Sequence, residues 1–241
     1  MQNNVEFVSS RLLNSAGVKH GWFMRYGGVS EDLFQSLNGK KGNGDTDSNV
    51  DENRKRACQA LGLDYKNLTH IVHEFKTNVL ETDELGERQG FDASISITKG
   101  QVLSQTTADC GTIIISNTSG SVVSVVHGSW HTLKDKIIHD VIRKMKAQTD
   151  EQLIAGLGPM ICKNCYEFGT EASTLFGAKY LQARGQKYLV DLKQMIIDQL
   201  YESGVSKIDD LNICTLEDGR FFSHRRSGAK SGRFLTLASL K

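Results

Sequence analysis

Apolar and polar positions along the chain follow two different periods, which predict alternating strands and helices. Residues 68–75, 101–105, 112–116 and 121–127 have the alternating or β-branched pattern of strands. In the first of these, alternation places His70 and His73 on opposite faces. The last is broken by Gly128 and Ser129, which places His127 at a corner between a strand and a helix.

Helical spacing appears in four segments. One helix is expected from a cap at Asn49 or Asp51 to about Leu61, and another over 133–145, where apolar residues recur every three to five positions. A short helix is expected after Thr170, and a longer one from Asp191 to Ser203.

The C-terminal part returns to the strand pattern. Residues 211–215 alternate, Asp218-Gly219 is typical of a hairpin turn, and 234–237 reads as a last strand. These elements predict one α/β domain over residues 1–241, with mixed β-sheets and helices flanking them.

Composition limits the classes of function. The chain of 241 residues has 29 Lys and Arg against 28 Asp and Glu, a formal net charge of +1, so a nucleic-acid-binding protein is not expected. The first residues lack the cationic and apolar run of a secretion signal, and no stretch approaches a membrane span. We therefore expect a cytoplasmic protein. Five cysteines, an odd number, favour free thiols or metal ligands over disulfides.

Three residues form the leading candidate site. His73 lies in a predicted strand, Cys110 before one, and His127 at the end of another. One thiolate and two imidazoles suit zinc, and three protein ligands leave a coordination position for substrate or water. The residues are 37 and 17 positions apart, so spacing alone also fits unrelated buried Cys and His side chains.

A basic run near the C-terminus is a candidate anion site. Between Arg220 and Arg233 lie Arg225, Arg226 and Lys230 but no acidic residue. Guanidinium groups bind phosphate or carboxylate through paired hydrogen bonds. A solvated basic hairpin is the alternative interpretation.

Cys162 and Cys165 have the two-residue gap of half a zinc ribbon or of a thioredoxin-type pair. No second cysteine pair accompanies them, and no helix clearly begins there. We therefore predict a structural role for both cysteines.

A series of short motifs in a fixed order gives the chain a family resemblance. It runs through Arg25-x-Gly27-Gly28-Val29-Ser30, Ser36-Leu37-Asn38, Gly44-Asp45, Val50-x-x-Asn53-Arg54, Val72-His73, Asp92-Ala93, Thr107-Ala108-Asp109-Cys110, Val126-His127-x-x-Trp130, Gly158-Pro159, Tyr166-Glu167-x-Gly169, Cys214-Thr215, Ser223-x-Arg225-Arg226 and Gly232-Arg233. Together these motifs resemble the YfiH-like proteins, a family labelled laccase-domain or polyphenol oxidase, over nearly the full length.

The resemblance implies a fold of mixed sheets flanked by helices, related in its core to the cysteine-hydrolase domain of a bacterial toxin. It implies zinc held by His73, Cys110 and His127. It also implies phosphorolysis of purine nucleosides (adenosine, inosine or methylthioadenosine) and adenosine deamination. The expected partners are therefore a purine nucleoside and phosphate, and the oligomeric state stays open.

The same resemblance implies roles for further residues. Cys110, His127 and Asp109 would be catalytic, Asp109 either carrying a proton or orienting its loop. Residues that would bind substrate or phosphate are Asn38, Arg54, Arg225, Arg226 and Arg233.

The chain departs from the family pattern beside all three ligands. Ile71 replaces a usual Gln, Glu74 a Gly, Gly111 a Pro and His131 an Arg, and Gly128-Ser129 replaces a small-Gly pair. The ligands are kept, so metal binding is expected, whereas substrate and rate are left open. The exchange at His131 removes a permanent charge.

Three other functions compete. A copper polyphenol oxidase is disfavoured because multicopper sites use His-x-His pairs, and none of the seven histidines forms one. A thiol hydrolase would use Cys110 as nucleophile and His127 as base. A non-catalytic paralogue would bind a nucleotide, or a protein partner, without turnover.

Overall fold

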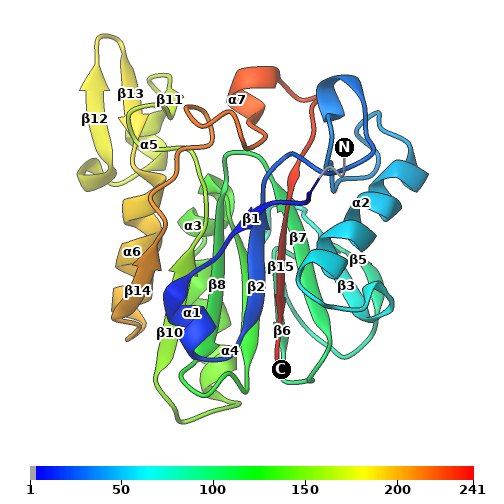
Figure 1. The fold of residues 1–241 in the computed structure, drawn as a ribbon. Coiled ribbons are helices and arrows are strands. Elements are labelled where there is room, and N and C mark those ends of the chain that lie inside the picture. Colours follow the sequence, from blue (N-terminus) through cyan, green and yellow to red (C-terminus); the bar gives the residue numbers. More distant parts are fainter. Residues whose placement is uncertain (1–3) are drawn as a thin grey trace.

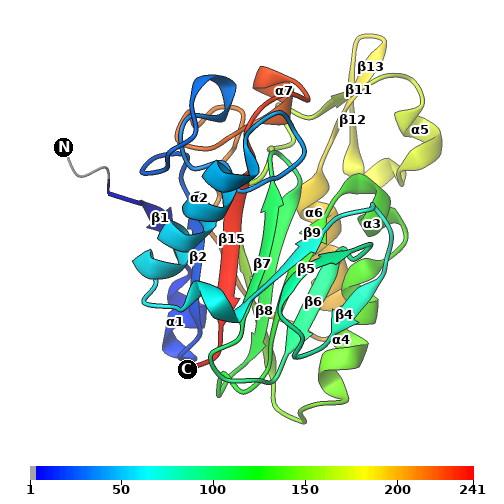
Figure 2. The same cartoon turned by 90° about the vertical axis from the view of Figure 1, so that its right-hand side faces the viewer.

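Two six-stranded sheets packed face to face form the centre of the computed structural model (Figures 1 and 2). The structure describes residues 4–241. Residues 1–3, which belong to the N-terminal segment that lacks the pattern of a secretion signal, lie outside the described part. The strands of the first sheet are, in spatial order, β1 (Phe7–Val8), β2 (Lys19–Phe23), β15 (Phe234–Ser239), β7 (Val102–Thr107), β3 (Leu68–Val72) and β5 (Gly86–Gln89).

The second sheet has the order β14 (Lys207–Asp210), β10 (Leu153–Leu157), β8 (Gly111–Asn117), β9 (Val123–Gly128), β6 (Ala93–Ser96) and β4 (Val79–Glu81). Both sheets are mixed, because antiparallel central pairs are extended by parallel neighbours such as β3 with β7 and β10 with β14. A small third sheet contains β11 (Glu167–Phe168), β13 (Lys187–Val190) and β12 (Leu181–Arg184).

Side-chain alternation divides the core into layers. In β8, Ile114 points between the two sheets and packs in one cluster with Leu103 and Phe234 of the first sheet. Ile113 and Ile115 point to the other face, toward the helices. A strand buried on both faces is apolar at successive positions, which explains the unbroken Ile113-Ile114-Ile115 run.

Helices cover the outer faces of the sandwich (Figure 2). The helix α2 (Asp47–Ala60) packs Ala57 and Cys58 on the first sheet. On the second sheet lie α4 (Ile137–Lys146) and α6 (Leu192–Glu202). The short helical segments are α1 (Arg11–Ser15), α3 (Trp130–Lys134), α5 (Ala172–Leu175), α7 (His224–Ser227), η1 (Asp32–Phe34), η2 (Tyr65–Asn67) and η3 (Ala178–Tyr180).

The predicted α/β fold with mixed sheets flanked by helices is therefore confirmed, while several local predictions are wrong. The helix predicted to begin at Asn49 or Asp51 is α2, and its cap is Thr46. The hydroxyl of Thr46 accepts from the amide of Asn49 at 3.3 Å. The helix expected over 133–145 is two helices, because Lys136 has a left-handed backbone (φ 61°) between α3 and α4.

The C-terminal strand predicted over 211–215 is also wrong. The strand β14 ends at Asp210, which pairs with Leu157. The neighbouring strand β10 also ends at Leu157, so residues 211–215 have no continuing strand beside them. Asp218-Gly219 is not a hairpin turn, since the chain runs from it into α7. Within residues 4–241, no helix has the length and apolarity needed to cross a bilayer.

The packing between the sheets predicts the effect of one substitution. Ile114→Ala removes a side chain with 0% exposure and leaves a cavity, so we expect the free energy of unfolding to fall by about 2–5 kcal/mol. The matched control is Ile97→Ala, at a side chain that is 58% exposed, where a change within about 0.5 kcal/mol is expected. Denaturant titration of both variants measures this, and equal effects would contradict the assigned core.

Candidate active site

A cavity of about 700 Å³ opens at the end of the sandwich where β3 and β7 finish and β8 begins. It is lined by His73, Cys110 and His127, the three predicted metal ligands. His73 follows the end of β3 at Val72, so its predicted place inside a strand is wrong by one residue. Cys110 directly precedes β8, and His127 is the penultimate residue of β9, as the sequence indicated.

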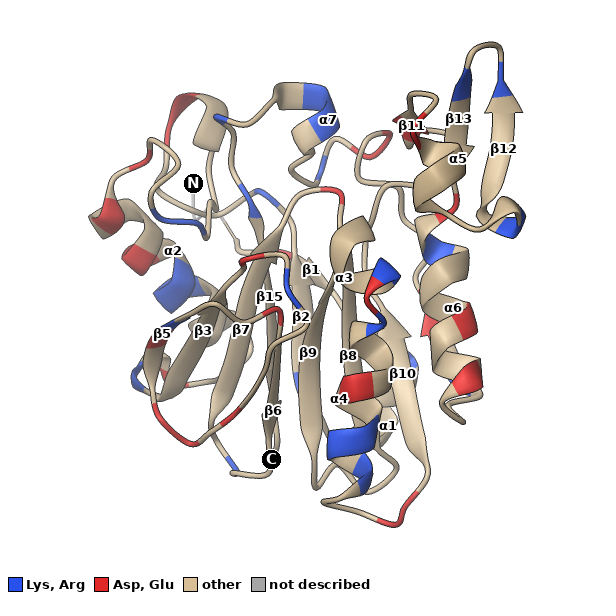
Figure 3. Ribbon diagram, turned by 180° about the vertical axis from the view of Figure 1, so that it is seen from behind, with Lys and Arg blue, Asp and Glu red and all other residues tan. Residues whose placement is uncertain are grey.

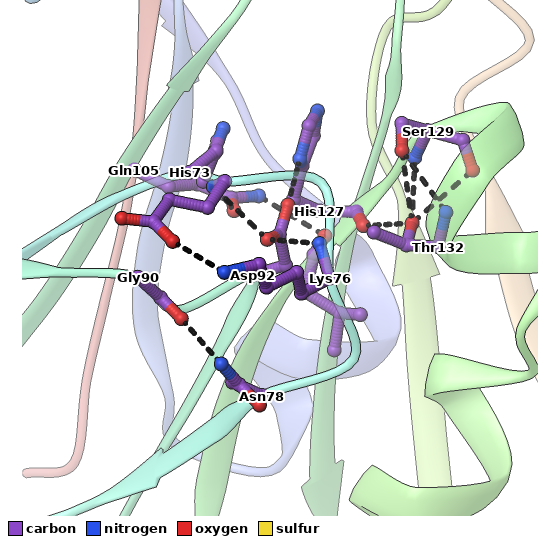
Figure 4. Close-up of polar contacts among 11 residues, drawn as sticks. His73, Lys76, Asn78, Gly90, Asp92, Gln105, His127, Ser129 and Thr132 are labelled. Atoms are coloured by element: carbon purple, nitrogen blue, oxygen red, sulfur yellow. Dashed lines mark hydrogen bonds and ion pairs between the residues drawn. The ribbon is translucent and has the colours of Figure 1, made fainter.

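The two histidines lie against each other. Their rings are stacked with centroids 3.8 Å apart and planes 10° from parallel. His127 is 2% exposed and its Nδ1 lies 2.7 Å from Oδ1 of Asp92 (Figure 4). This bond leaves the second ring nitrogen of His127 for another partner.

Asp92 holds both histidine-bearing segments. Its carboxylate, fully buried, bonds to His127 through Oδ1 and accepts backbone N–H groups of Glu74 (3.2 Å) and Lys76 (2.9 Å) through Oδ2. The turn after His73 is thus fixed by the same side chain that orients His127. Sequence reasoning assigned no role to Asp92; the signal that could have found it was the Asp92-Ala93 motif.

Charges around the two rings separate their pKa values. Burial alone would lower the pKa of His127, but the neighbouring Cys110 sulfur and the Asp92 carboxylate raise it to about 9. Burial, together with the charge of His127, lowers the pKa of His73 well below its ordinary value. His73 therefore keeps an uncharged nitrogen, the form that binds a metal ion.

A group of possible metal ligands lies in the cavity, but it is not the set predicted from the sequence. In this cavity the ligand atoms of His73, Asp92 and His127 lie within 4.8 Å of one another, and Cys110 is not in that group although its sulfur is near enough to raise the pKa of His127. Both oxygens of Asp92 already bond to His127 and to backbone amides. A carboxylate that fixes a histidine in this way is a common support for a metal ligand.

Asp109 has an orienting position. It has a left-handed backbone (φ 89°), and its carboxylate accepts from the hydroxyl of Thr215 at 2.6 Å and from the backbone N–H of Arg225 at 2.7 Å. The main-chain oxygen of Asp109 accepts from Ile161. Of the two roles considered for Asp109, these bonds support orientation of the Cys110 loop.

The predicted anion-binding residues divide into two groups. Arg54, Arg225 and Arg233 line the cavity. Arg54 is 2% exposed and pairs with Glu87 at 2.5 Å, which neutralises it, whereas Arg233 bonds chiefly to main-chain carbonyls and has no acidic partner among the residues described. Figure 3 shows the basic residues of α7 at this end of the molecule.

Asn38 and Arg226 do not line the cavity. Asn38 is fully buried and bonds to Lys40, Asp45 and the amide of Arg233. Arg226 donates to the carbonyls of Thr215 and Leu216, each at 3.0 Å. Both therefore support the loops around the cavity.

Other cavity residues were missed by sequence reasoning. Lys40 and Lys41 lie just before Gly42, in a segment of which only Gly44-Asp45 belongs to a family motif. Lost contact with water and the charge of Arg233 lower the pKa of Lys40. One wall of the cavity is aromatic and is formed by Phe75, Trp130, Tyr166 and Phe168. No local sequence pattern links these residues, so the wall was not predicted.

The departures from the family pattern have structural consequences. His131, in place of an Arg, stacks on Trp130 with ring centroids 3.5 Å apart and lines the cavity as a flat ring. Ser129 caps α3 through Thr132 in a reciprocal pair of hydrogen bonds. A Cβ at Gly111 would lie 2.5 Å from the end of the Ile196 side chain, so this position has little room for a larger residue.

The two remaining departures, Ile71 and Glu74, differ in their exposure to solvent. Ile71 is 1% exposed in β3. Glu74 is exposed and pairs with Lys76 at 2.9 Å, next to the amides that bond to Asp92.

Comparisons with known proteins agree on one family. The sequence profile of the family described as "Multi-copper polyphenol oxidoreductase laccase" matches residues 19–241. The "Purine nucleoside phosphorylase YfiH" of Shigella flexneri is 34% identical over 210 residues, covering 84% of this chain and 86% of the relative. A purine nucleoside phosphorylase of Xylella fastidiosa (strain Temecula1) is 32% identical over 233 residues, with 88% and 87% covered.

Among solved structures, the Neisseria meningitidis protein NMB0706 has a TM-score of 0.88 to this chain. The two sequences are 30% identical, and the match covers 99% of each chain. The sandwich therefore has a fold already observed by crystallography.

The bond from Asp92 to His127 predicts a measurable change. In metal-free protein, Asp92→Asn should move the pKa of His127 from about 9 toward the ordinary histidine value of 6.5, because a neutral amide no longer stabilises the imidazolium. NMR titration of the ring protons measures this. His20, buried elsewhere, should keep its lowered pKa in the same spectra. An unchanged His127 would disprove the role of Asp92.

Proposed function

The chain belongs to the family described as multi-copper polyphenol oxidoreductase laccase, and we propose that within this family it is a purine nucleoside phosphorylase. The observation that carries the proposal is that one cavity combines an aromatic wall, the His73, Cys110 and His127 side chains, and cations that have no acidic partner in the part of the chain that the structure describes. Such a cavity can hold an aromatic base and an anion side by side. The relatives named as phosphorylases support the same reaction.

Phosphate would bind at the basic side of the cavity. Arg233 and Lys40 line it, and the pKa of Lys40 is lowered first by lost contact with water and then by the charge of Arg233. Two cations that repel each other gain from an anion between them. Arg225 lies on the same wall and stacks over Tyr166, with its guanidinium carbon 5.4 Å from the ring centroid.

The purine would bind at the aromatic side. Trp130 and His131 present stacked rings, and Phe75 lies 5.7 Å from His131 between ring centroids. Phe75 is 52% exposed, unusual for a large apolar side chain, and a planar base would cover it.

In the proposed reaction, an oxygen of hydrogen phosphate forms a bond to C1′ of the ribose as the bond to the purine nitrogen breaks. The electron pair of that bond goes to the base, and the proton of hydrogen phosphate ends on the base nitrogen. The products are ribose 1-phosphate and a free purine, and nothing is oxidised. The protein contributes by holding the two substrates in contact and oriented.

The metal proposed for this site is zinc. His73, Cys110 and His127 would hold it, with Asp92 orienting His127. When bound, zinc supplies a Lewis acid that polarises an electronegative atom of the substrate. Copper, suggested by the family description, is less suited to this site because the cavity holds no His-x-His pair.

One observation favours a second candidate function. Cys110 and His127 line the same cavity, and the Cys110 sulfur is near enough to raise the pKa of His127, an arrangement that also serves a thiol nucleophile and its base. A thiol hydrolase would keep its activity after chelation and lose it on alkylation. A non-catalytic paralogue would bind nucleoside without turnover.

The proposed reaction predicts that purified protein releases adenine or hypoxanthine from nucleosides only when phosphate is present. Cys110→Ala should abolish this release and remove about one zinc per chain, because a metal ligand is lost. Chromatography of the products of adenosine, inosine and methylthioadenosine, beside elemental analysis, measures both. Inosine formed from adenosine would report the deamination that the family resemblance implies.

Cys58→Ala is the matched control, since Cys58 is buried against the first sheet, away from the cavity, and should leave both properties intact. A Cys110→Ala protein that retains its turnover and its metal would refute the proposed site.

The basic wall predicts a separate kinetic effect. Arg233→Gln should raise KM for phosphate by about 10- to 100-fold, the loss expected when a charged hydrogen-bond donor is removed. KM for the nucleoside should change little. Arg220→Gln is the control, because Arg220 pairs with Asp218 outside the cavity. Equal phosphate KM values in the two variants would place the phosphate elsewhere.

A further inference from the structure

A second group of metal-ligand side chains lies outside the active-site cavity. It consists of Cys162, Cys165, Cys214 and Glu217, whose ligand atoms all lie within 4.8 Å of one another. None of the four lines the main cavity; three of them line a separate cavity of about 240 Å³. The sequence holds no second cysteine pair, and the structure places Cys214 and Glu217 beside the first one.

The four residues form two pairs with the same spacing. Cys162-Lys163-Asn164-Cys165 and Cys214-Thr215-Leu216-Glu217 each place two ligands three positions apart. Each pair lies in a turn: the amide of Cys165 donates to the carbonyl of Cys162 at 3.0 Å, and the amide of Asp218 donates to that of Cys214 at 2.9 Å. Two such turns facing each other are the arrangement of a zinc ribbon, with a carboxylate replacing one thiolate.

The two turns are held together although they are 52 positions apart. Met160 and Cys214 form a parallel bridge, in which the amide of Met160 donates to Ile213 at 3.1 Å and that of Thr215 donates to Met160 at 3.2 Å. The ligands are thus brought together by backbone pairing and do not depend on flexible side chains alone.

Contacts between the turns already involve the ligand atoms. The backbone N–H of Cys162 donates to the sulfur of Cys214 at 3.4 Å, and the thiol of Cys165 donates to a carboxylate oxygen of Glu217 at 3.4 Å. The three cysteines are partly buried and Glu217 is exposed, so an ion could enter from solvent.

We propose that Cys162, Cys165, Cys214 and Glu217 bind one Zn²⁺ ion as a structural site. In a tetrahedral site with zinc–sulfur bonds of about 2.3 Å, ligand sulfurs are about 3.8 Å apart, so closing the observed group requires shifts of about 1 Å or less. Three thiolates favour zinc over magnesium or calcium. Four protein ligands fill the coordination, which is typical of structural zinc.

The position of this site gives it a role in the cavity. Tyr166 and Phe168, which line the active-site cavity, directly follow the first turn. The second turn is held by Arg226 through the carbonyls of Thr215 and Leu216, and it leads into α7, which carries Arg225 (Figure 1). A bound ion would therefore fix two neighbouring walls of the cavity relative to each other.

The test counts metal ions in variants that separate the two sites. Reduced protein is loaded with Zn²⁺, freed of excess metal and analysed for zinc. We expect about two zinc ions per wild-type chain, about one after Cys162→Ser/Cys165→Ser, and none after Cys110→Ala is added to that pair. Cys58→Ala should retain both ions.

Cobalt provides a second readout that does not depend on activity. In a Cys110→Ala background, Co²⁺ should give the charge-transfer absorption of a thiolate-bound ion, and Cys162→Ser/Cys165→Ser should abolish it. Glu217→Gln, which keeps all three sulfurs, should retain this absorption but require more Co²⁺ to reach it. Circular dichroism confirms that the variants are folded.

The two proposals fail in different ways. Wild-type protein with one zinc that is lost after Cys162→Ser/Cys165→Ser but kept after Cys110→Ala would support this site and refute the catalytic one. Cys110→Ala protein that binds neither Zn²⁺ nor Co²⁺ would overturn the structural site. A disulfide among Cys162, Cys165 and Cys214, detected by alkylation of the purified, metal-free protein without reductant, would also overturn it.

Discussion

The buried carboxylate of Asp92 connects the two parts of the candidate active site. One oxygen orients His127 at the end of β9, and the other holds the turn that follows His73. A carboxylate with no exposure to water is unfavourable unless its oxygens are hydrogen-bonded, and here both are. Stacking of the two imidazoles and their position in the cavity depend on these bonds.

The layered fold explains why residues distant in sequence meet. Because β3 and β7 run parallel in the first sheet, the loops that follow them leave at the same end of the sandwich. The second sheet brings the end of β9 to that end as well, through the pairing of Gly111 with Gly128. The side chains of the candidate site thus lie on loops and strand ends, while the apolar layers behind them provide a rigid support.

The local sequence pattern predicted those features of the structure that depend on residues close together in the chain. Periodicity predicted the strand that contains His127, the start of β8 after Cys110 and the α/β composition. The family motifs indicated the candidate site residues. The link from Asp92 to His127 spans 35 positions and that from Cys162 to Cys214 spans 52. Such contacts depend on how the sheets pack, which no local period encodes. For the same reason Asn38 and Arg226, polar residues that resembled ligands for substrate, proved to bond to neighbouring loops.

We propose that His73, Cys110 and His127 bind one metal ion together. Anomalous diffraction at the zinc absorption edge, from crystals of the zinc-loaded protein, tests this most directly. We expect a peak in the active-site cavity within about 2.0–2.3 Å of a nitrogen of each histidine and of the Cys110 sulfur. Density without such a peak, and with the three side chains directed apart, would contradict it.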